Sequence, residues 1–164
     1  MGVRIDDLRR RWDPRMAARI ESHVTVLYET PGVQELHPVV RAVKPLQLRA
    51  GGVKRWTSEP GIFVAVLDPH DHLRRFRTAV LGIDDPGYRP HVTLLHHESV
   101  TSARQAEDAW HALRGESFDL DFSVTELIVF EEIDGAWREA GRLRFGVGAV
   151  RRGSPEGTDR AEAQ

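Results

Sequence analysis

Hydrophobic and polar positions along this chain follow two spacings, one typical of strands and one typical of helices. Apolar runs, or apolar residues at every second position, predict strands over residues 3–12, 22–29, 46–56, 61–67 and 91–97. Apolar residues three and four positions apart predict helices over residues 15–20, 33–43, 70–81 and 102–113. Two later strands, residues 118–130 and 136–147, are predicted to form a hairpin around Asp134 and Gly135.

Proline and glycine positions sharpen these boundaries. Pro38 is tolerated best in a first helical turn, so the helix of residues 33–43 is expected to begin near His37. Gly51 and Gly52 predict a bend in the strand of residues 46–56, and Gly82 predicts the end of a helix. Residues 151–164 are polar without an apolar face, which predicts a disordered tail after a single domain over residues 1–150.

A short motif occurs twice, as His23-Val24-Thr25 and as His91-Val92-Thr93. Each copy lies in a predicted strand that is followed by a predicted helix. Because residues i and i+2 of a strand share a face, each copy presents a histidine together with a threonine while its valine faces a core. Two such strands facing each other would form a site for a phosphate group.

Composition narrows the class of ligand. The 164 residues are 40% hydrophobic and 29% charged, as in an ordinary globular protein. A net charge of −2 argues against a broad basic surface for duplex nucleic acid, but it leaves a small or terminal phosphate open. The absence of cysteine excludes disulfides, thiol nucleophiles and cysteine metal sites. The start of the chain lacks the apolar core of a signal peptide, and no run reaches the roughly 20 apolar residues of a membrane span, so a cytoplasmic location is expected.

Through His23, Thr25, His91 and Thr93 the chain resembles the two-histidine (2H) phosphoesterase superfamily, which includes 2′-5′ RNA ligase-like proteins and cyclic nucleotide phosphodiesterases. Members of that family carry two His-x-Thr or His-x-Ser motifs on strands of two similar lobes. The resemblance therefore implies an α+β fold in which two pseudo-symmetric lobes of antiparallel sheet, with helices outside, surround a central cleft.

The residue types fit phosphodiester chemistry. Opening a 2′,3′-cyclic phosphate or cleaving a 2′-5′ linkage needs one group to accept a proton and another to donate one, and two histidines supply both. The hydroxyls of Thr25 and Thr93 would bind the non-bridging phosphate oxygens. We therefore expect a hydrolase acting on RNA ends or small nucleotides, without metal or cofactor. The reverse reaction, 2′-5′ ligation, stays open, as does the choice of which histidine is the acid.

Other residues near the second motif are candidate substrate contacts. Arg89 is a cation placed to meet a phosphate, and His97 would share a strand face with His91 by alternation. Tyr88 directly precedes Arg89 and offers an aromatic ring. The aromatic residues available to stack on a nucleobase are Trp56, Tyr88 and Trp137.

Two alternatives use other features of the chain. A metal site at His70, Asp71 and His72 or at His96 and His97 has suitable ligand types, but neighbours on a strand point to opposite faces. A non-catalytic module that binds an RNA end or a nucleotide is the second alternative, although both histidines and both threonines of the motifs are present. No membrane or protein partner is indicated.

Overall fold

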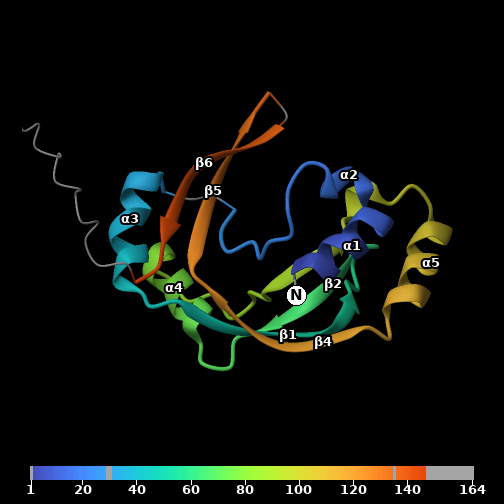
Figure 1. The fold of residues 1–164 in the computed structure, drawn as a ribbon, viewed down its shortest axis with the longest axis horizontal. Helices are drawn as coiled ribbons and strands as arrows, with labels where there is room; N and C mark the ends of the chain where they lie inside the picture. The colour runs from blue at the N-terminus through green and yellow to red at the C-terminus, as the bar shows by residue number, and fades with distance from the viewer. Residues whose placement is uncertain (1, 29–30, 135, 147–164) are drawn as a thin grey trace, which may run out of the picture.

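The chain consists of helices and antiparallel strands, with helices at its start and strands at its end (Figure 1). The computed structural model describes residues 2–28, 31–134 and 136–146, so the predicted tail of residues 151–164 lies outside the described residues. Within the described residues, no helix is long and apolar enough to cross a membrane. In chain order the elements are α1 (Gly2–Trp12), α2 (Pro14–Ala17), α3 (Val33–Ala42), β1 (Leu46–Arg55), β2 (Ile62–Leu67), α4 (His72–Leu81), β3 (His91–Leu95), the 3₁₀ helix η1 (His97–Ser99), α5 (Ala103–Leu113), β4 (Ser117–Val124), β5 (Glu126–Ile133) and β6 (Ala136–Arg144).

A four-stranded antiparallel sheet in the order β3-β2-β1-β4 carries the second motif (Figure 1). One of its faces is apolar and joins a core to which α4 and α5 also contribute. The pairing register of β1 shifts between Ala50 and Val53, which confirms the bend expected at the two glycines between them. The buried residues of this core include Leu48, Ala50, Val64, Val92 and Leu94 from the strands and Leu73, Phe76, Ala109 and Leu113 from the helices.

The opposite face of the same sheet carries the polar residues of the second motif. His91 pairs with Ala65 and Thr93 pairs with Phe63 across β2 and β3, and paired residues of antiparallel strands lie on one face. Val92, between them, is buried in the core on the other side. The register therefore places the histidine and threonine together on one face, as the alternation of residue types predicts.

The strand predicted over residues 118–130 is in fact two strands in different sheets. β4 ends at Val124 on the four-stranded sheet, and β5 starts at Glu126 and pairs with β6. The carbonyl of Thr125, at the crossing point, accepts a hydrogen bond of 2.9 Å from the amide of Phe145. The predicted hairpin is confirmed, with Ile133 paired to Ala136, and α3 packs against β6. The sheets and helices together confirm the α+β class.

Most predicted helices are confirmed, but α3 starts earlier than expected. It runs from Val33 with Pro38 inside it, whereas the proline was expected to mark the start near His37. Proline at this position removes only the bond to the carbonyl four residues earlier, in a solvent-exposed part of the helix. The buried face formed by Leu36 and Val40 supports the helix across the proline. Gly82 ends α4 with a left-handed φ of 71°, as predicted.

The strand predicted over residues 3–12 is wrong, because this segment is helix α1. Ile5, Leu8 and Trp12 are spaced by three and four residues, so they form a helical stripe. Ile5 on this stripe is only 1% exposed and belongs to the core. Apolar burial, rather than the weak alternation in the sequence, decides the structure of this segment.

The strand predicted over residues 22–29 is also wrong within its described part, residues 22–28. These residues carry the first motif but are not paired with another strand. Their carbonyl groups are bonded by side chains instead, with the Tyr88 hydroxyl on Thr25 and the Arg77 guanidinium on Val26. Side-chain donors thus replace the backbone ladder that a strand partner would have supplied.

Candidate functional site

The histidine of the second motif is oriented by its own backbone. Nδ1 of His91 lies 2.7 Å from the carbonyl oxygen of Arg89, two residues earlier. A carbonyl oxygen accepts only, so Nδ1 carries the hydrogen of this bond and Nε2 is left for another partner. The imidazole therefore has one defined tautomer when it is neutral, with a basic Nε2.

Two aromatic rings surround His91 on the sheet face. Trp56 stacks on Phe63 with ring centroids 4.2 Å apart, and the His91 ring meets them edgewise at 5.0 and 5.4 Å. Gly61 makes this arrangement possible, because a Cβ atom there would lie 2.8 Å from Cδ1 of Trp56. The aromatic pair and the Arg89 carbonyl together restrict the orientation of His91.

The histidine of the first motif has the same local bond in a different setting. Nδ1 of His23 lies 2.8 Å from the carbonyl oxygen of Glu21, again two residues earlier. Its Nε2 is consequently the nitrogen left for a ligand, as at His91. The two motifs share one local arrangement although only His91 lies on a paired strand.

The electrostatic surroundings of His23 favour its neutral form. Although part of the ring is exposed, the enclosing protein atoms lower its pKa by removing water, and the nearby positive groups of Arg9 and His91 lower the pKa further. The bond to the Glu21 carbonyl acts in the opposite direction. The charge of His91 is thus among the groups that lower the pKa of His23.

Thr25 and Thr93 are both half-buried beside their histidines. Thr93 lies on the same sheet face as His91. The backbone carbonyl of Thr25 accepts a hydrogen bond of 2.9 Å from the Tyr88 hydroxyl, which holds the first motif beside the segment that leads into the second.

Of the three predicted substrate contacts near the second motif, Tyr88 and Arg89 bond within the protein and His97 lies outside strand β3. The Tyr88 hydroxyl is bonded to Thr25, and the guanidinium carbon of Arg77 lies 3.8 Å from the centroid of the Tyr88 ring. Arg89 donates to the carbonyl of Pro86 at 2.6 Å and so folds back onto its own loop. The expectation that His97 shares a strand face with His91 is wrong, since β3 ends at Leu95 and His97 lies in η1.

The three aromatic residues considered for base stacking lie in different places. Trp56 is beside His91, whereas Tyr88 is covered by Arg77. Trp137 lies on β6 near the hairpin end, 42% exposed. Trp56 is therefore the one of the three in ring contact with a motif histidine.

Two arginines near the first motif did not stand out in the sequence, the buried Arg9 and the partly buried Arg77. Arg9 is 4% exposed and donates at 2.8 Å to the carbonyl of Ile20, just before the motif. Burial lowers the pKa of Arg9, while the carboxylates of Asp6 and Asp13 raise it. Arg77 is four residues after the buried Leu73, so both arginines occupy apolar positions of helical stripes. That unusual placement was the signal available for finding them.

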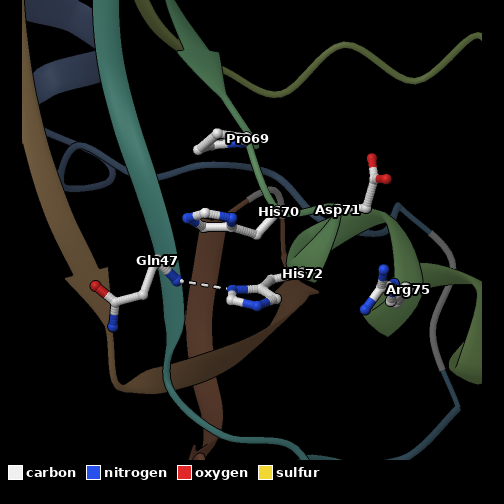
Figure 2. A pocket seen from close by; sticks show the side chains of 6 residues that line it. All are labelled: Gln47, Pro69, His70, Asp71, His72 and Arg75. Carbon is white, nitrogen blue, oxygen red and sulfur yellow. Dashed lines mark hydrogen bonds between the residues drawn. The ribbon is translucent and has the colours of Figure 1, made fainter.

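A surface depression of about 580 Å³ lies at the start of α4 (Figure 2). Nδ1 of His72 accepts a hydrogen bond of 3.4 Å from the backbone amide of Gln47. The side chain of Asp71 points away from His70 and His72. In residues 2–28, 31–134 and 136–146, no three histidine, aspartate or glutamate side chains gather in a metal-binding group. The depression is lined by Gln47, Pro69, His70, Asp71, His72 and Arg75.

Comparison with known proteins identifies the class. The model of the 2′-5′ RNA ligase superfamily matches residues 2–136, and the chain belongs to this family. Its fold is similar to that of TT0787 from Thermus thermophilus, with a TM-score of 0.56 and 16% identity over 88% of this chain and 91% of that one. It is also similar to Escherichia coli LigT, in a structure complexed with NADP+, with a TM-score of 0.51 and 15% identity over 88% and 92% of the two chains. The search of curated proteins found no match.

Proposed function

We propose that the protein is a metal-independent phosphoesterase that hydrolyses 2′,3′-cyclic phosphates or 2′-5′ phosphodiesters of RNA ends or small nucleotides. Membership of the 2′-5′ RNA ligase superfamily supports this class of chemistry. The observation that carries the proposal is the matched pair of histidines. Each ring donates from Nδ1 to the carbonyl two residues earlier and keeps Nε2 for a ligand, and the Tyr88 hydroxyl ties the first motif to the segment that leads into the second.

The proposed reaction moves one proton at each histidine. Nε2 of one neutral imidazole takes a proton from water while the water oxygen bonds to phosphorus. The bond from phosphorus to the leaving ribose oxygen then breaks, and Nε2–H of the other imidazolium protonates that oxygen. The lowered pKa of His23 favours its neutral form, which suits the base in the hydrolytic direction. Hydroxyls of Thr25 and Thr93 donate hydrogen bonds to the non-bridging oxygens as charge builds on them.

The ligand is proposed to be a nucleotide or an RNA terminus that lies between two lobes. We propose that the four-stranded sheet with the second motif forms one lobe, and that the β5-β6 hairpin, against which α3 packs, forms the other. The NADP+ in the LigT structure is a nucleotide bound by a protein of similar fold, and it supports this ligand class. Trp56, in edge contact with His91, is the proposed aromatic neighbour of the bound nucleoside.

The test is direct incubation of the purified protein with 2′,3′-cyclic AMP and, separately, with 2′-5′-linked diadenylate. Each reaction is run with and without EDTA, and the products are separated by chromatography. We expect a nucleoside monophosphate from the cyclic substrate at a rate that EDTA leaves unchanged. A strict requirement for a divalent ion would contradict the proposed mechanism.

Two other outcomes remain informative. Joining of a 2′,3′-cyclic end to a 5′-hydroxyl end would show that the same two histidines also work in the ligation direction. Saturable binding of either substrate without product would favour the non-catalytic module. The unpaired backbone around His23 is the feature of this chain most compatible with that module.

A further inference from the structure

The loop between α4 and β3 contacts both motifs at once. The Arg89 carbonyl holds Nδ1 of His91 at 2.7 Å, and the hydroxyl of Tyr88, the preceding residue, holds the carbonyl of Thr25 at 2.9 Å. Adjacent residues of one loop therefore determine the orientation of the second histidine and the position of the first motif. A displacement of this loop would change both.

Arg77 on α4 braces that loop from inside the protein. Its side chain is 11% exposed, and Nη2 lies 2.6 Å from Oδ2 of Asp85 at the start of the loop. The same guanidinium stacks on the Tyr88 ring and donates to the carbonyl of Val26, the residue directly after the first motif. The guanidinium of this pair is sheltered from solvent, whereas the side chain of Asp85 is 39% exposed.

The Tyr88 contact persists over the working pH range. Burial raises the pKa of the Tyr88 hydroxyl far above its ordinary value, so the group stays protonated and remains a donor. The segment that accepts this bond has no strand partner among the described residues. Side-chain donors from Tyr88 and Arg77 are therefore major supports of the first motif.

We propose that residues 85–89 and Arg77 form a bridge that holds the two His-x-Thr motifs at a fixed separation, with Tyr88 and Arg77 as positioning residues. Its kinetic consequence rests on the proposed phosphoesterase function, whereas its structural consequence does not. Reacting groups must be placed to within a fraction of an ångström, since a misplacement of ~1 Å can cost about 100-fold in rate. The bridge acts on kcat more than on KM, because it sets the separation of the histidines.

The test compares Tyr88→Phe with a matched control on the same helix and loop. Tyr88→Phe keeps the ring under Arg77 and removes only the hydroxyl that reaches Thr25. The control is Arg74→Lys, because Arg74 on α4 pairs with Asp84 of the loop without reaching either motif. We expect Tyr88→Phe to lower kcat by about 10- to 100-fold with little change in KM, and Arg74→Lys to keep the kcat of the unmodified protein.

A second measurement follows His23 without any need for turnover. The quantity to measure by NMR is the pKa of His23. Enclosure of the ring and the nearby groups of Arg9 and His91 lower this pKa in the intact protein. If Tyr88→Phe releases the first motif, this pKa returns toward the ordinary histidine value, while Arg74→Lys leaves it in place. Asp85→Asn, which loosens the brace at Arg77 but alters no group of the motifs, is expected to shift it in the same direction.

The outcomes separate the bridge from the proposed function. An unchanged His23 pKa in both Tyr88→Phe and Asp85→Asn would overturn the bridge, whether or not the protein is an enzyme. Intact kcat in Tyr88→Phe would overturn it as well. Absence of turnover in the unmodified protein, together with a shifted His23 pKa in the variants, would instead reject the phosphoesterase and retain the bridge.

Discussion

The two His-x-Thr motifs share a local bond but are supported in different ways. His91 lies on β3, where the backbone is paired with β2 and the ring is enclosed by Trp56 and Phe63. His23 lies in an unpaired segment whose carbonyl groups are bonded by side chains from α1, α4 and the loop after α4. The comparison shows that the same ring orientation can be reached with a backbone ladder or with side-chain tethers.

The two kinds of support also differ in how easily a single mutation removes them. Strand pairing involves several backbone bonds that no single substitution removes, since every residue type except proline keeps its amide donor. The tethers of the first motif depend on individual side chains, notably Tyr88 and Arg77. The first motif is therefore the more sensitive of the two to mutation.

The largest expected effect is on kcat. Although the two motifs are supported differently, loss of either histidine should lower kcat by a similar factor. His23→Ala and His91→Ala should each lower kcat by roughly 10² to 10⁴-fold, because each removes one proton-transfer group. His111→Ala, an exposed histidine of α5, is the control and should keep full activity. Steady-state assays on 2′,3′-cyclic AMP measure this, and activity above about a tenth in either motif variant would contradict the assignment of that histidine.

The next largest effect concerns the contact that ties the N-terminal helices to the end of β3. Asp13 is 2% exposed, and its carboxylate accepts from the amides of Met16 at 3.0 Å and His96 at 2.8 Å. Asp13→Ala should lower the free energy of unfolding by about 2 to 4 kcal/mol, from the lost helix cap and the unpaired His96 amide.

Ser102→Ala is the matched control for Asp13. Ser102 caps α5 by accepting from Gln105 at 3.2 Å, and it makes no such link between distant segments. Its loss should cost about 1 kcal/mol. Urea unfolding followed by circular dichroism measures both variants, and equal losses would show that the Asp13 link to β3 adds nothing to stability.

A smaller effect is expected from crowding the aromatic support of His91. Gly61→Ala would place a methyl group 2.8 Å from Trp56 Cδ1, so the indole must move away from Phe63 and His91. Overpacking of this kind costs about 1 to 3 kcal/mol. Gly115→Ala, with open space around its Cβ position, is the control. Thermal unfolding measures the loss of stability, and NMR of the His91 ring measures the change in its surroundings. A His91 signal that is unchanged in Gly61→Ala would mean that Trp56 does not orient the His91 ring.

The smallest effect is the contribution of His23 to the pH dependence of stability. Its pKa is lowered in the folded protein relative to the ordinary value of 6.5, so below pH 6.5 the unfolded chain binds more protons. Stability therefore falls as the pH is lowered through this range, and the contribution of His23 is absent at higher pH. His23→Gln should flatten the curve between about pH 5 and 7 relative to the unmodified protein, a small change because the side chain is partly exposed. Denaturant titrations across this range measure the difference, and identical curves would exclude a lowered pKa.

Much of the fold could be predicted from the spacing of apolar residues. The helices α4 and α5, the buried strand β2 and the β5-β6 hairpin were predicted because their patterns are long or carry a clear turn signal. The break at Thr125 was missed, because both β4 and β5 favour extended backbone and only the packing of two sheets separates them. Helix α1 was missed because its apolar stripe is short and interrupted by arginines.

Only part of the candidate site could be predicted from the sequence. His23 and His91 stood out because their motif is repeated, and the bond from each Nδ1 to the carbonyl two residues earlier is local. Trp56 was considered as a stacking residue, but its contact with His91 depends on the turn between β1 and β2 and on the missing side chain of Gly61. Arg77 and Arg9 occupy apolar positions of helical stripes, which is a weak signal among many arginines, and only the packing showed that their side chains are sheltered from solvent.

The sequence by itself determined the residues of the two motifs, their local hydrogen bonds and most helices and strands, because these depend on neighbours along the chain. The tertiary structure decided that the first motif lies outside any strand, that Tyr88 and Arg77 tether it, and that the loop before His91 lies beside it. The physical reason is the separation along the chain of the groups that interact. A buried guanidinium or hydroxyl finds its acceptor among segments that are distant in the chain, and only the packing of the whole core brings those segments together.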